Sequence, residues 1–230
     1  MLNARSNLNI VRVGNNITYS SLRTIGDGIL EAFHGMIQAV ELAHHNAPAM
    51  ESIDAHLLTM ILHDEYGGHT LGITDADLKT DDDDEFYNSI FGGKNTKNDV
   101  AVVSTNKLSP EKINTDSEYE LFIQRTLKVS LHEVGHNFGL VDHPSFRTTT
   151  DGSLCPMSRG EQNKFGTVGY VLAVIDGRGM NFCDECADFM GHVYGFRQIN
   201  LQSIDTGAGK PKVVPDGLAI FKFRLPDERC

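Results

Sequence analysis

The sequence predicts an α/β (α+β) fold, in which a twisted mixed sheet is combined with a long N-terminal helix, a second long helix and a C-terminal helix. Short runs rich in β-branched residues, typical of strands, alternate with stretches in which apolar residues recur every three or four positions. The 230 residues are 40% hydrophobic, which is enough to bury a substantial core. We expect one domain over residues 1–197 and a tail over 198–230 that forms a β-hairpin packed on the same domain.

The first half of the chain contains several strand candidates and one helix candidate. Residues 8–13 (LNIVRV) predict a first strand. Apolar residues from 22 to 43 recur mostly at steps of three and four, so we expect one long amphipathic helix there. The apolar run within residues 56–66 has the length of a strand and suits the centre of a sheet, covered on both faces. Residues 85–93 and 100–105 are two further strand candidates.

The second half predicts two helices. Ser117 and Glu120 have the spacing of a capping box, and helical periodicity continues after them, so we expect a helix over about 118–138. Residues 181–196 (NFCDECADFMGHVYGF) predict a short C-terminal helix. The segment between these helices has no regular pattern.

Composition excludes several classes of function. The formal net charge is −11 and the basic residues are scattered, so a nucleic-acid backbone would be repelled. We find no apolar stretch long enough for a secretory signal or a membrane span. We therefore expect a cytoplasmic protein that binds neither nucleic acid nor membrane; no oligomeric state is predicted.

The motif HEVGH at 132–136 carries the chemistry. His132 and His136 lie one helical turn apart and so point their rings to one side, where two imidazoles can bind a single Zn²⁺ at ~2.0–2.1 Å each. Glu133 follows the first ligand and can reach a water on the metal without binding the metal itself. This arrangement is typical of a general base beside a Lewis-acidic zinc.

Two neighbouring residues compete for the third ligand position. Gly139 is a natural end for the helix, and Asp142 follows it at the spacing HExxHxxGxxD, with His143 one position later. Successive residues of an extended segment point in opposite directions, so one of the pair should face the metal and the other should face away. The register favours Asp142, although a one-residue bulge would reverse the assignment to His143.

Several further segments follow the motif pattern of a known family. They are HTLGITDADL at 69–78, IFGG at 90–93, AVVSTNKL at 101–108, CPM at 155–157 and CDEC at 183–186. Together with the HExxH motif, they resemble the successive landmarks of the archaemetzincins, a family in the metzincin clan of zinc peptidases, over roughly residues 56–190. Archaemetzincins carry HExxHxxGxxHC, then Cys-x-Met, then Cys-x-x-C. The resemblance implies a metzincin-like fold whose second long helix presents the catalytic zinc.

The same resemblance implies a role for each of the remaining ligand-type residues. Position by position, the third catalytic ligand falls on Asp142 and the family's first cysteine on His143. The other implied positions are Cys155, Cys183 and Cys186 for the remaining cysteines of a structural zinc site and Met157 for the methionine of the Met-turn. Two zinc ions per chain are therefore expected, one in a His₂Asp set and one in a Cys₃His set, both of them normal zinc ligand types.

This chain also departs from the family pattern. The gaps from His143 to Cys155 and from Met157 to Cys183 are longer than in the family, which indicates two insertions. If an insertion moved Cys155 away, the structural site would be incomplete. The alternative for the CDEC pair is free or redox-active thiols at a helix N-terminus.

We interpret the chain as a zinc metallopeptidase that hydrolyses a peptide or protein substrate with Glu133 as the general base. One alternative is a non-proteolytic amide hydrolase that uses the same site, and another is a zinc-stabilised binding module with a vestigial site. A third ligand taken from a distant glutamate, such as Glu161 or Glu185, would make the site thermolysin-like. The Gly139–Asp142 turn argues against that variant.

Overall fold

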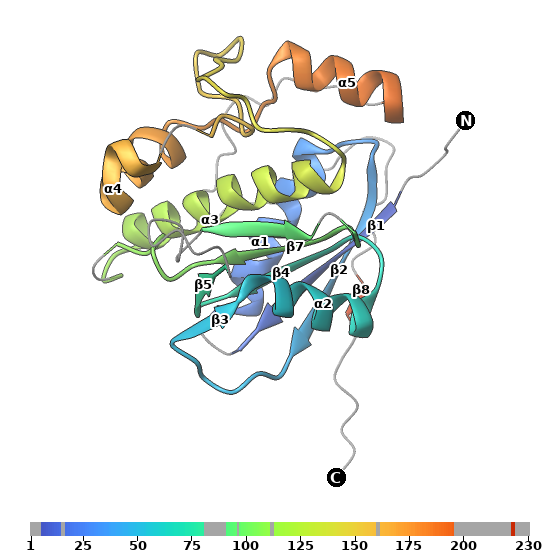
Figure 1. Ribbon diagram of the computed structural model, residues 1–230, viewed down its shortest axis with the longest axis vertical. Helices are drawn as coiled ribbons and strands as arrows, with labels where there is room; N and C mark the ends of the chain where they lie inside the picture. Colours follow the sequence, from blue (N-terminus) through green and yellow to red (C-terminus); the bar gives the residue numbers. More distant parts are fainter. Residues whose placement is uncertain are drawn as a thin grey trace.

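The computed structural model describes residues 6–14, 17–80, 91–95, 97–110, 113–159, 162–195 and 222–223. A six-stranded sheet with the order β6-β7-β4-β1-β2-β8 forms its centre (Figure 1). In chain order these strands are β1 (Ser6–Val13), β2 (Ile37–His45), β4 (Thr70–Thr74), β6 (Gly92–Asn95), β7 (Val100–Ser104) and β8 (Lys222–Phe223). Strand β6 runs antiparallel to β7, whereas the other pairings are parallel. The sheet is therefore mixed, as predicted, with an antiparallel strand at one edge.

Helices cover both faces of the sheet. Helices α1 (Tyr19–Ala32) and α3 (Asp116–Asn137) pack on one face, and α2 (Ala55–Tyr66) packs on the other. A small second sheet pairs β3 (Ser52–Asp54) with β5 (Asp77–Lys79). Beyond α3 lie α4 (Gln162–Tyr170), the π-helix η1 (Val171–Ile175) and α5 (Asp184–Tyr194). In Figure 1 these last elements lie above α3, on the side of that helix away from the sheet.

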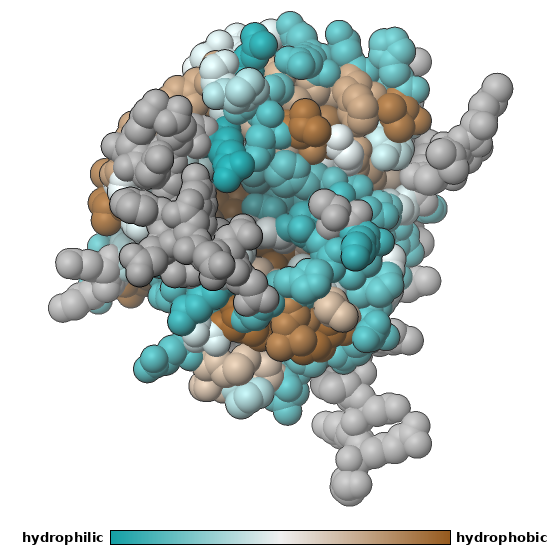
Figure 2. Space-filling model, viewed as in Figure 1, coloured by the Kyte–Doolittle hydropathy of each residue, from teal (hydrophilic) through white to brown (hydrophobic). Residues whose placement is uncertain are grey.

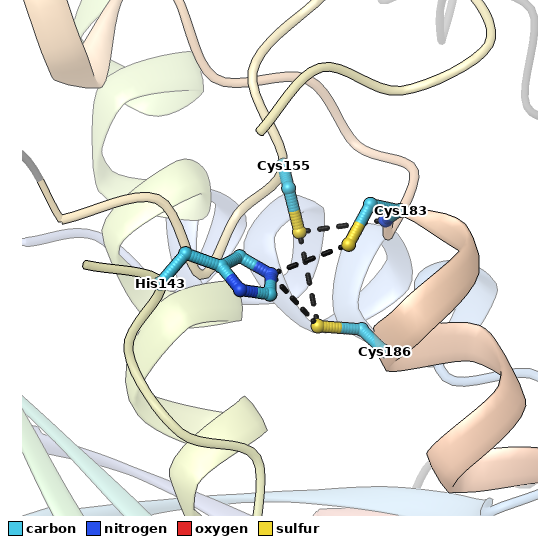
Figure 3. Close-up of side chains that lie close together, drawn as sticks. All are labelled: His143, Cys155, Cys183 and Cys186. Carbon is cyan, nitrogen blue, oxygen red and sulfur yellow. Dashed lines mark hydrogen bonds between the residues drawn. The ribbon is translucent and has the colours of Figure 1, made fainter. Parts of the chain in front are cut away.

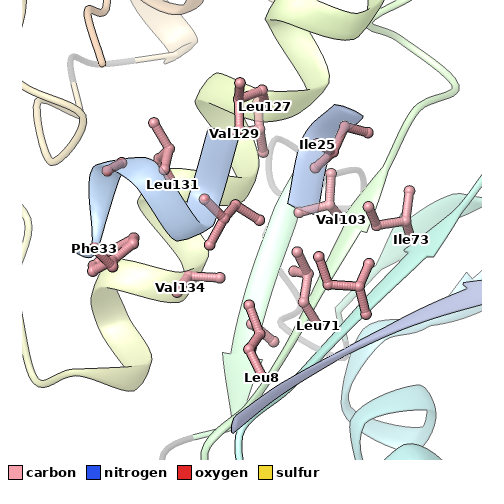
Figure 4. Close-up of a cluster of buried hydrophobic side chains, with 14 of the residues drawn as sticks. Leu8, Ile25, Phe33, Leu71, Ile73, Val103, Leu127, Val129, Leu131 and Val134 are labelled. Atoms are coloured by element: carbon pink, nitrogen blue, oxygen red, sulfur yellow. The ribbon is translucent and has the colours of Figure 1, made fainter. Parts of the chain in front are cut away.

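The larger hydrophobic core lies between the sheet, α1 and α3. Figure 4 shows side chains from the strands, such as Leu8 and Leu71, meeting side chains from both helices, such as Ile25 and Val134. All four of these side chains are fully buried. Burying a side chain of this size stabilises a fold by roughly 1.5–3 kcal/mol, so this layer fixes α3 firmly on the sheet.

The helix predicted over residues 22–43 is correct only in its first half. Helix α1 ends at Ala32, and a turn containing Gly35, at φ 87°, leads into β2. That left-handed conformation suits glycine and interrupts the helix. The following segment then pairs with β1 along its full length, so sheet pairing overrides the helical spacing.

The strand predicted within residues 56–66 is wrong, because these residues form α2. The side chain of Asp54 caps this helix by accepting a hydrogen bond from the backbone of Leu57 at 2.6 Å. A central position in the sheet is taken by β4 instead. All of its residues are buried, and it pairs with β1 on one side and β7 on the other.

The predictions for the other elements have mixed outcomes. The strands at 8–13 and 100–105 and the helices at 118–138 and 181–196 are confirmed, the last as the shorter α5. The capping box of α3 uses Thr115 and Glu118, not Ser117 and Glu120. Helix α4 and η1 fall in a segment for which no regular structure was predicted.

Two of the strand predictions lie largely outside the described residues. Of the strand predicted at 85–93, residues 85–90 are outside, and β6 begins only at Gly92. Of the tail, only Lys222–Phe223 are described, and they pair with β2 in parallel. The predicted hairpin itself is outside the described part. Within that part, no helix is long and apolar enough to cross a membrane.

Candidate functional site

The end of α3 presents the HExxH motif to a cleft of about 560 Å³. The cleft is lined by residues of α3, the edge strand β6, the segment after α3 and the η1 region. They are Phe91, Gly92, Gly93, Lys94, Val129, His132, Glu133, His136, Gly139, Leu140, Val141, Asp142, Arg159, Tyr170, Ile175 and Arg178. At the level of α3, the surface across the middle of the view in Figure 2 is mainly hydrophilic. The described residues thus combine an open cleft with the predicted catalytic motif.

The two histidines and Asp142 converge on one point in this cleft. Nε2 of His132 and Nε2 of His136 lie 3.2 Å apart. Helix α3 ends at Asn137, and Gly139, at φ 82°, turns the chain back towards the histidines, as predicted. Oδ1 of Asp142 then lies 3.3 Å from Nε2 of His132 and 3.5 Å from Nε2 of His136.

Hydrogen bonds on the far side of each histidine ring determine whether its Nε2 carries a hydrogen or a lone pair. Nδ1 of His132 contacts the carbonyl of Pro156, and Nδ1 of His136 contacts the carbonyl of Leu140, each at 2.9 Å. A carbonyl oxygen can only accept, so each Nδ1 carries the hydrogen and each neutral ring presents a bare lone pair at Nε2. Oδ1 of Asp142 is buried without a hydrogen-bond partner. Three lone pairs therefore face one another.

This donor set fits zinc. Ligand atoms at ~2.0–2.1 Å from a tetrahedral zinc are about 3.3 Å from one another. The three separations in the cluster are 3.2, 3.3 and 3.5 Å. Arg159 Nη1 lies 3.4 Å from Oδ2 of Asp142, so it occupies the carboxylate oxygen that the other two residues do not use. The remaining oxygen is left to bind a cation.

His143 points away from this cluster and into a second one. Figure 3 shows its ring and the sulfurs of Cys155, Cys183 and Cys186 directed towards a common centre. The ligand-type atoms of the four residues lie within 4.8 Å of one another, and all four residues are buried. The backbone N–H of His143 donates to the carbonyl of Met157 at 2.9 Å, which fixes the orientation of the extended segment.

The second cluster also has dimensions that fit zinc. Nε2 of His143 lies 3.2 Å from Sγ of Cys183 and 3.3 Å from Sγ of Cys186, and Sγ of Cys155 lies 3.9 Å from Sγ of Cys186. A tetrahedral zinc with Zn–S of ~2.3 Å would separate two sulfurs by about 3.8 Å. The hydrogen bond between Cys155 and Cys186 lowers the pKa of Cys155 and raises the pKa of Cys186, so Cys155 is the more readily ionised of the two thiols. The insertion before Cys155 does not move that residue away.

Glu133 is held close to the first cluster. Its side chain is buried, and burial raises its pKa to about 7. Strand β6 passes directly against it at Gly92, where an added Cβ would lie 2.5 Å from Oε1 of Glu133. Only a glycine leaves room for the carboxylate at this position.

Met157 is fully buried and packs against α3. Its sulfur packs against α3 so closely that a Cβ added at Gly135 would lie 2.7 Å from it. This is the position of the predicted Met-turn. The two distant glutamates do not join the first cluster: Glu185 approaches Nδ1 of His143 at 4.0 Å, and Glu161 lies outside the described residues.

Sequence reasoning missed four polar residues that line the cleft: Lys94, Arg159, Tyr170 and Arg178. Lys94 donates a hydrogen bond to the carbonyl of His136 and so ties β6 to the end of α3. The hydroxyl of Tyr170 donates to the carbonyl of Arg159 at 3.1 Å. No spacing in the sequence linked these side chains to the motif, because they come from a different strand and from the longer segment after Met157.

Comparison with known proteins gives consistent similarities. The profile described as Peptidase family M54 matches residues 4–192. The archaemetzincin of Thermococcus kodakarensis is 42% identical over 78 residues, which are 34% of this chain and 40% of that protein. The archaemetzincin of Pyrococcus furiosus is 33% identical over 104 residues, 45% of this chain and 48% of that protein. The matched segments therefore span less than half of these curated relatives.

A solved structure extends the similarity to the fold. The crystal structure of an archaemetzincin from Methanopyrus kandleri has a TM-score of 0.62 and 23% sequence identity, and the match covers 82% of this chain and 95% of that one. At this level of identity the comparison concerns the fold. It agrees with the predicted mixed α/β architecture.

Proposed function

The chain belongs to Peptidase family M54, and from that premise we propose that it is a zinc-dependent metallopeptidase of archaemetzincin type that hydrolyses peptide bonds. One observation carries the proposal: three lone pairs, on Nε2 of His132, Nε2 of His136 and Oδ1 of Asp142, face one point in an open cleft. These three residues would hold the catalytic zinc. When bound there, zinc supplies a Lewis acid that polarises a carbonyl and makes water more acidic.

Glu133 would act as the general base. Its carboxylate would accept the proton of the attacking water and later deliver that proton to the leaving amine. A base is most effective when its pKa lies near the working pH, and burial raises the pKa of Glu133 to about 7. Packing against β6 at Gly92 would keep this carboxylate in one position.

His143, Cys155, Cys183 and Cys186 would hold a second, structural zinc. This assignment is supported by four buried ligand-type side chains at separations normal for a tetrahedral site. Two zinc ions per chain are thus proposed. Asp142 would serve the catalytic ion and His143 the structural one, because neighbouring residues of an extended segment face opposite ways.

Metal stoichiometry tests this division. The purified protein is expected to contain two zinc ions per chain by elemental mass spectrometry, and Asp142→Ala and Cys183→Ala are each expected to lose one. Peptide hydrolysis should stop in Asp142→Ala and after treatment of the wild type with a chelator, and added zinc should restore the chelated wild type. A protein that contains one zinc, lost only in Cys183→Ala, would be a zinc-stabilised binding module instead. Hydrolysis of small amides without hydrolysis of peptides would favour an amide hydrolase.

Replacing Gly92 with alanine tests the packing of the general base. The new methyl group would overlap Glu133 and displace its carboxylate, so kcat/KM on a peptide should fall by roughly 10- to 100-fold. Zinc content and the melting temperature serve as controls, because β6 is a short edge strand and the substitution leaves both clusters intact. Unchanged kcat/KM in a folded, zinc-loaded Gly92→Ala protein would contradict the proposed role.

A further inference from the structure

The cleft concentrates positive charge in an acidic protein. The chain has a formal net charge of −11, yet Lys94, Arg159 and Arg178 all line the cleft. The acidic side chains among the lining residues are Glu133 and Asp142, and under the proposed function a zinc dication lies beside them. The cleft therefore carries an excess of positive charge, which attracts a negatively charged group on a ligand.

Arg178 is the most unusual of these cations because it is buried. Its side chain is 3% exposed, and its Nε and Nη2 donate to the carbonyl of Ser158 at 3.1 and 2.8 Å. Among the described residues, no carboxylate lies within ion-pair distance of Arg178, although Glu133 and Asp142 attract its charge at longer range, and its Nη1 forms no hydrogen bond. A buried cation without a paired anion is costly. Nη1 is therefore available to an anion that enters the cleft.

Hydrogen bonds from α3 fix the position of the turn that carries Arg178. Arg125 of α3 forms two hydrogen bonds of 2.8 Å to the carboxylate of Asp176, two residues before Arg178. Lys128 of the same helix donates to the backbone carbonyl of Asp176 at 2.7 Å. These bonds hold the turn that carries Arg178 against α3, so the guanidinium is already in place before a ligand arrives. Preorganisation of this kind lowers the cost of binding.

Apolar side chains also line the cleft. Val129 lies one turn before His132 on α3, and Ile175 and Tyr170 come from the segment that leads to Arg178. The ring of Tyr170 stacks on Phe91, with centroids 5.5 Å apart. Apolar walls with one buried guanidinium suit a short aliphatic group that ends in a carboxylate, because the walls bury the methylene groups and the arginine pairs with the charge.

We propose that the cleft selects peptides that place a carboxylate next to the scissile bond and that Nη1 of Arg178 binds this carboxylate. This proposal rests on the proposed peptidase function, because the selected group is part of the substrate. The carboxylate has two chemical sources: the side chain of a glutamate or aspartate, and the α-carboxylate at the end of a peptide. Arg159 is exposed at the cleft and assists by attracting the charge from a distance.

Binding of matched peptides tests the selection without requiring turnover. Dye-labelled hexapeptides are compared with glutamine or glutamate at each position in turn, each with a C-terminal amide or a free acid. Fluorescence anisotropy with the zinc-loaded Glu133→Gln protein gives their dissociation constants, and the wild type is assayed for hydrolysis. We expect a carboxylate in one position, as a side chain or as the terminus, to tighten binding by about 10- to 100-fold over its amide counterpart. Equal affinities across all pairs would overturn the proposal.

Substitution of Arg178 assigns the effect to this residue. Arg178→Met keeps the aliphatic stem and removes the charge, so the ratio of affinities between the acidic and amide peptides should fall to about 1. Arg178→Lys keeps a charge without the planar fork and should give an intermediate ratio. Arg147→Met is the matched control, since Arg147 is exposed, pairs with Glu185 and does not line the cleft. A wild-type ratio in folded Arg178→Met would overturn the assignment, as would a ratio that falls equally in Arg147→Met.

The two proposals fail in different ways. If the wild type cleaves none of the peptides, the peptidase proposal fails, whereas the anisotropy ratio still reports on the carboxylate site. If the wild type cleaves amide and acidic peptides with equal kcat/KM and the affinities are also equal, the carboxylate proposal fails and the peptidase proposal stands. The melting temperature of Arg178→Met shows whether the loss of its bonds to Ser158 has unfolded the chain, in which case Arg178→Lys and the wild-type comparison decide.

Discussion

Replacing Glu133 with glutamine is expected to lower kcat for peptide hydrolysis by ~10²–10⁴-fold, the usual contribution of a general base. Glutamine keeps the shape of the side chain in its buried position beside Gly92 but cannot accept a proton. Zinc content should remain that of the wild type, because Glu133 is not one of the converging ligand-type residues. Steady-state kinetics on a peptide, with zinc measured on the same samples, checks this prediction.

The matched control is Glu120→Gln, which makes the same chemical change on an exposed part of the same helix. It should leave kcat close to the wild-type value. A Glu133→Gln protein that hydrolyses peptides as fast as the wild type would show that another group takes the proton. A Glu133→Gln protein that has lost zinc would instead indicate a role in holding the cluster together.

Replacing Cys186 with serine is expected to cause the largest loss of stability. Helix α5 has two buried residues, Cys186 and Met190, so the cysteine cluster provides much of its attachment. Structural zinc contributes directly to folding, and losing one ligand should lower the free energy of unfolding by about 3 kcal/mol or more. For a chain of this size that corresponds to a melting temperature roughly 6–12 °C lower. Thermal unfolding followed by circular dichroism measures it.

Asp142→Ala provides the comparison, because it removes a ligand from the other cluster. The large core holds helix α3 against the sheet, so the melting temperature of Asp142→Ala should fall much less than that of Cys186→Ser. If Cys186→Ser melts at the wild-type temperature and keeps the wild-type zinc content, the thiols are free and the proposal of a structural zinc site is wrong. Equal losses of stability in both variants would mean that the catalytic ion also supports the fold.

Local signals in the sequence were sufficient for part of the fold. The segment at 8–13 is rich in β-branched residues, and the helix over 118–138 has a long, consistent periodicity. The helix prediction for residues 37–45 was wrong because their apolar spacing fits a helix as well as a strand, and only pairing with β1 decides between the two. The strand prediction for residues 56–66 was wrong for another reason: the residue that caps α2, Asp54, lies outside the apolar run.

The candidate ligands could be found because their positions follow fixed local spacings. His132 and His136 share one turn of helix, Asp142 follows a helix-ending glycine, and the cysteines form short motifs. The cations of the cleft could not be found in this way. Arg178 reaches the cleft only because a turn is tied to α3 through Asp176, a contact across 51 residues of sequence. Burial of its charge is a property of the folded chain and leaves no pattern in the sequence.

The adjacency of Asp142 and His143 limits how the chain can change during evolution. One peptide bond joins a ligand-type residue of each cluster, so inserting or deleting a single residue between Gly139 and His143 would reverse both side chains at once. Substitutions within this stretch alter one cluster, but a change in its length disrupts both. Insertions and deletions are tolerated in segments that do not fix the orientation of ligands for both clusters. This chain is longer than the family pattern in two such segments, from His143 to Cys155 and from Met157 to Cys183.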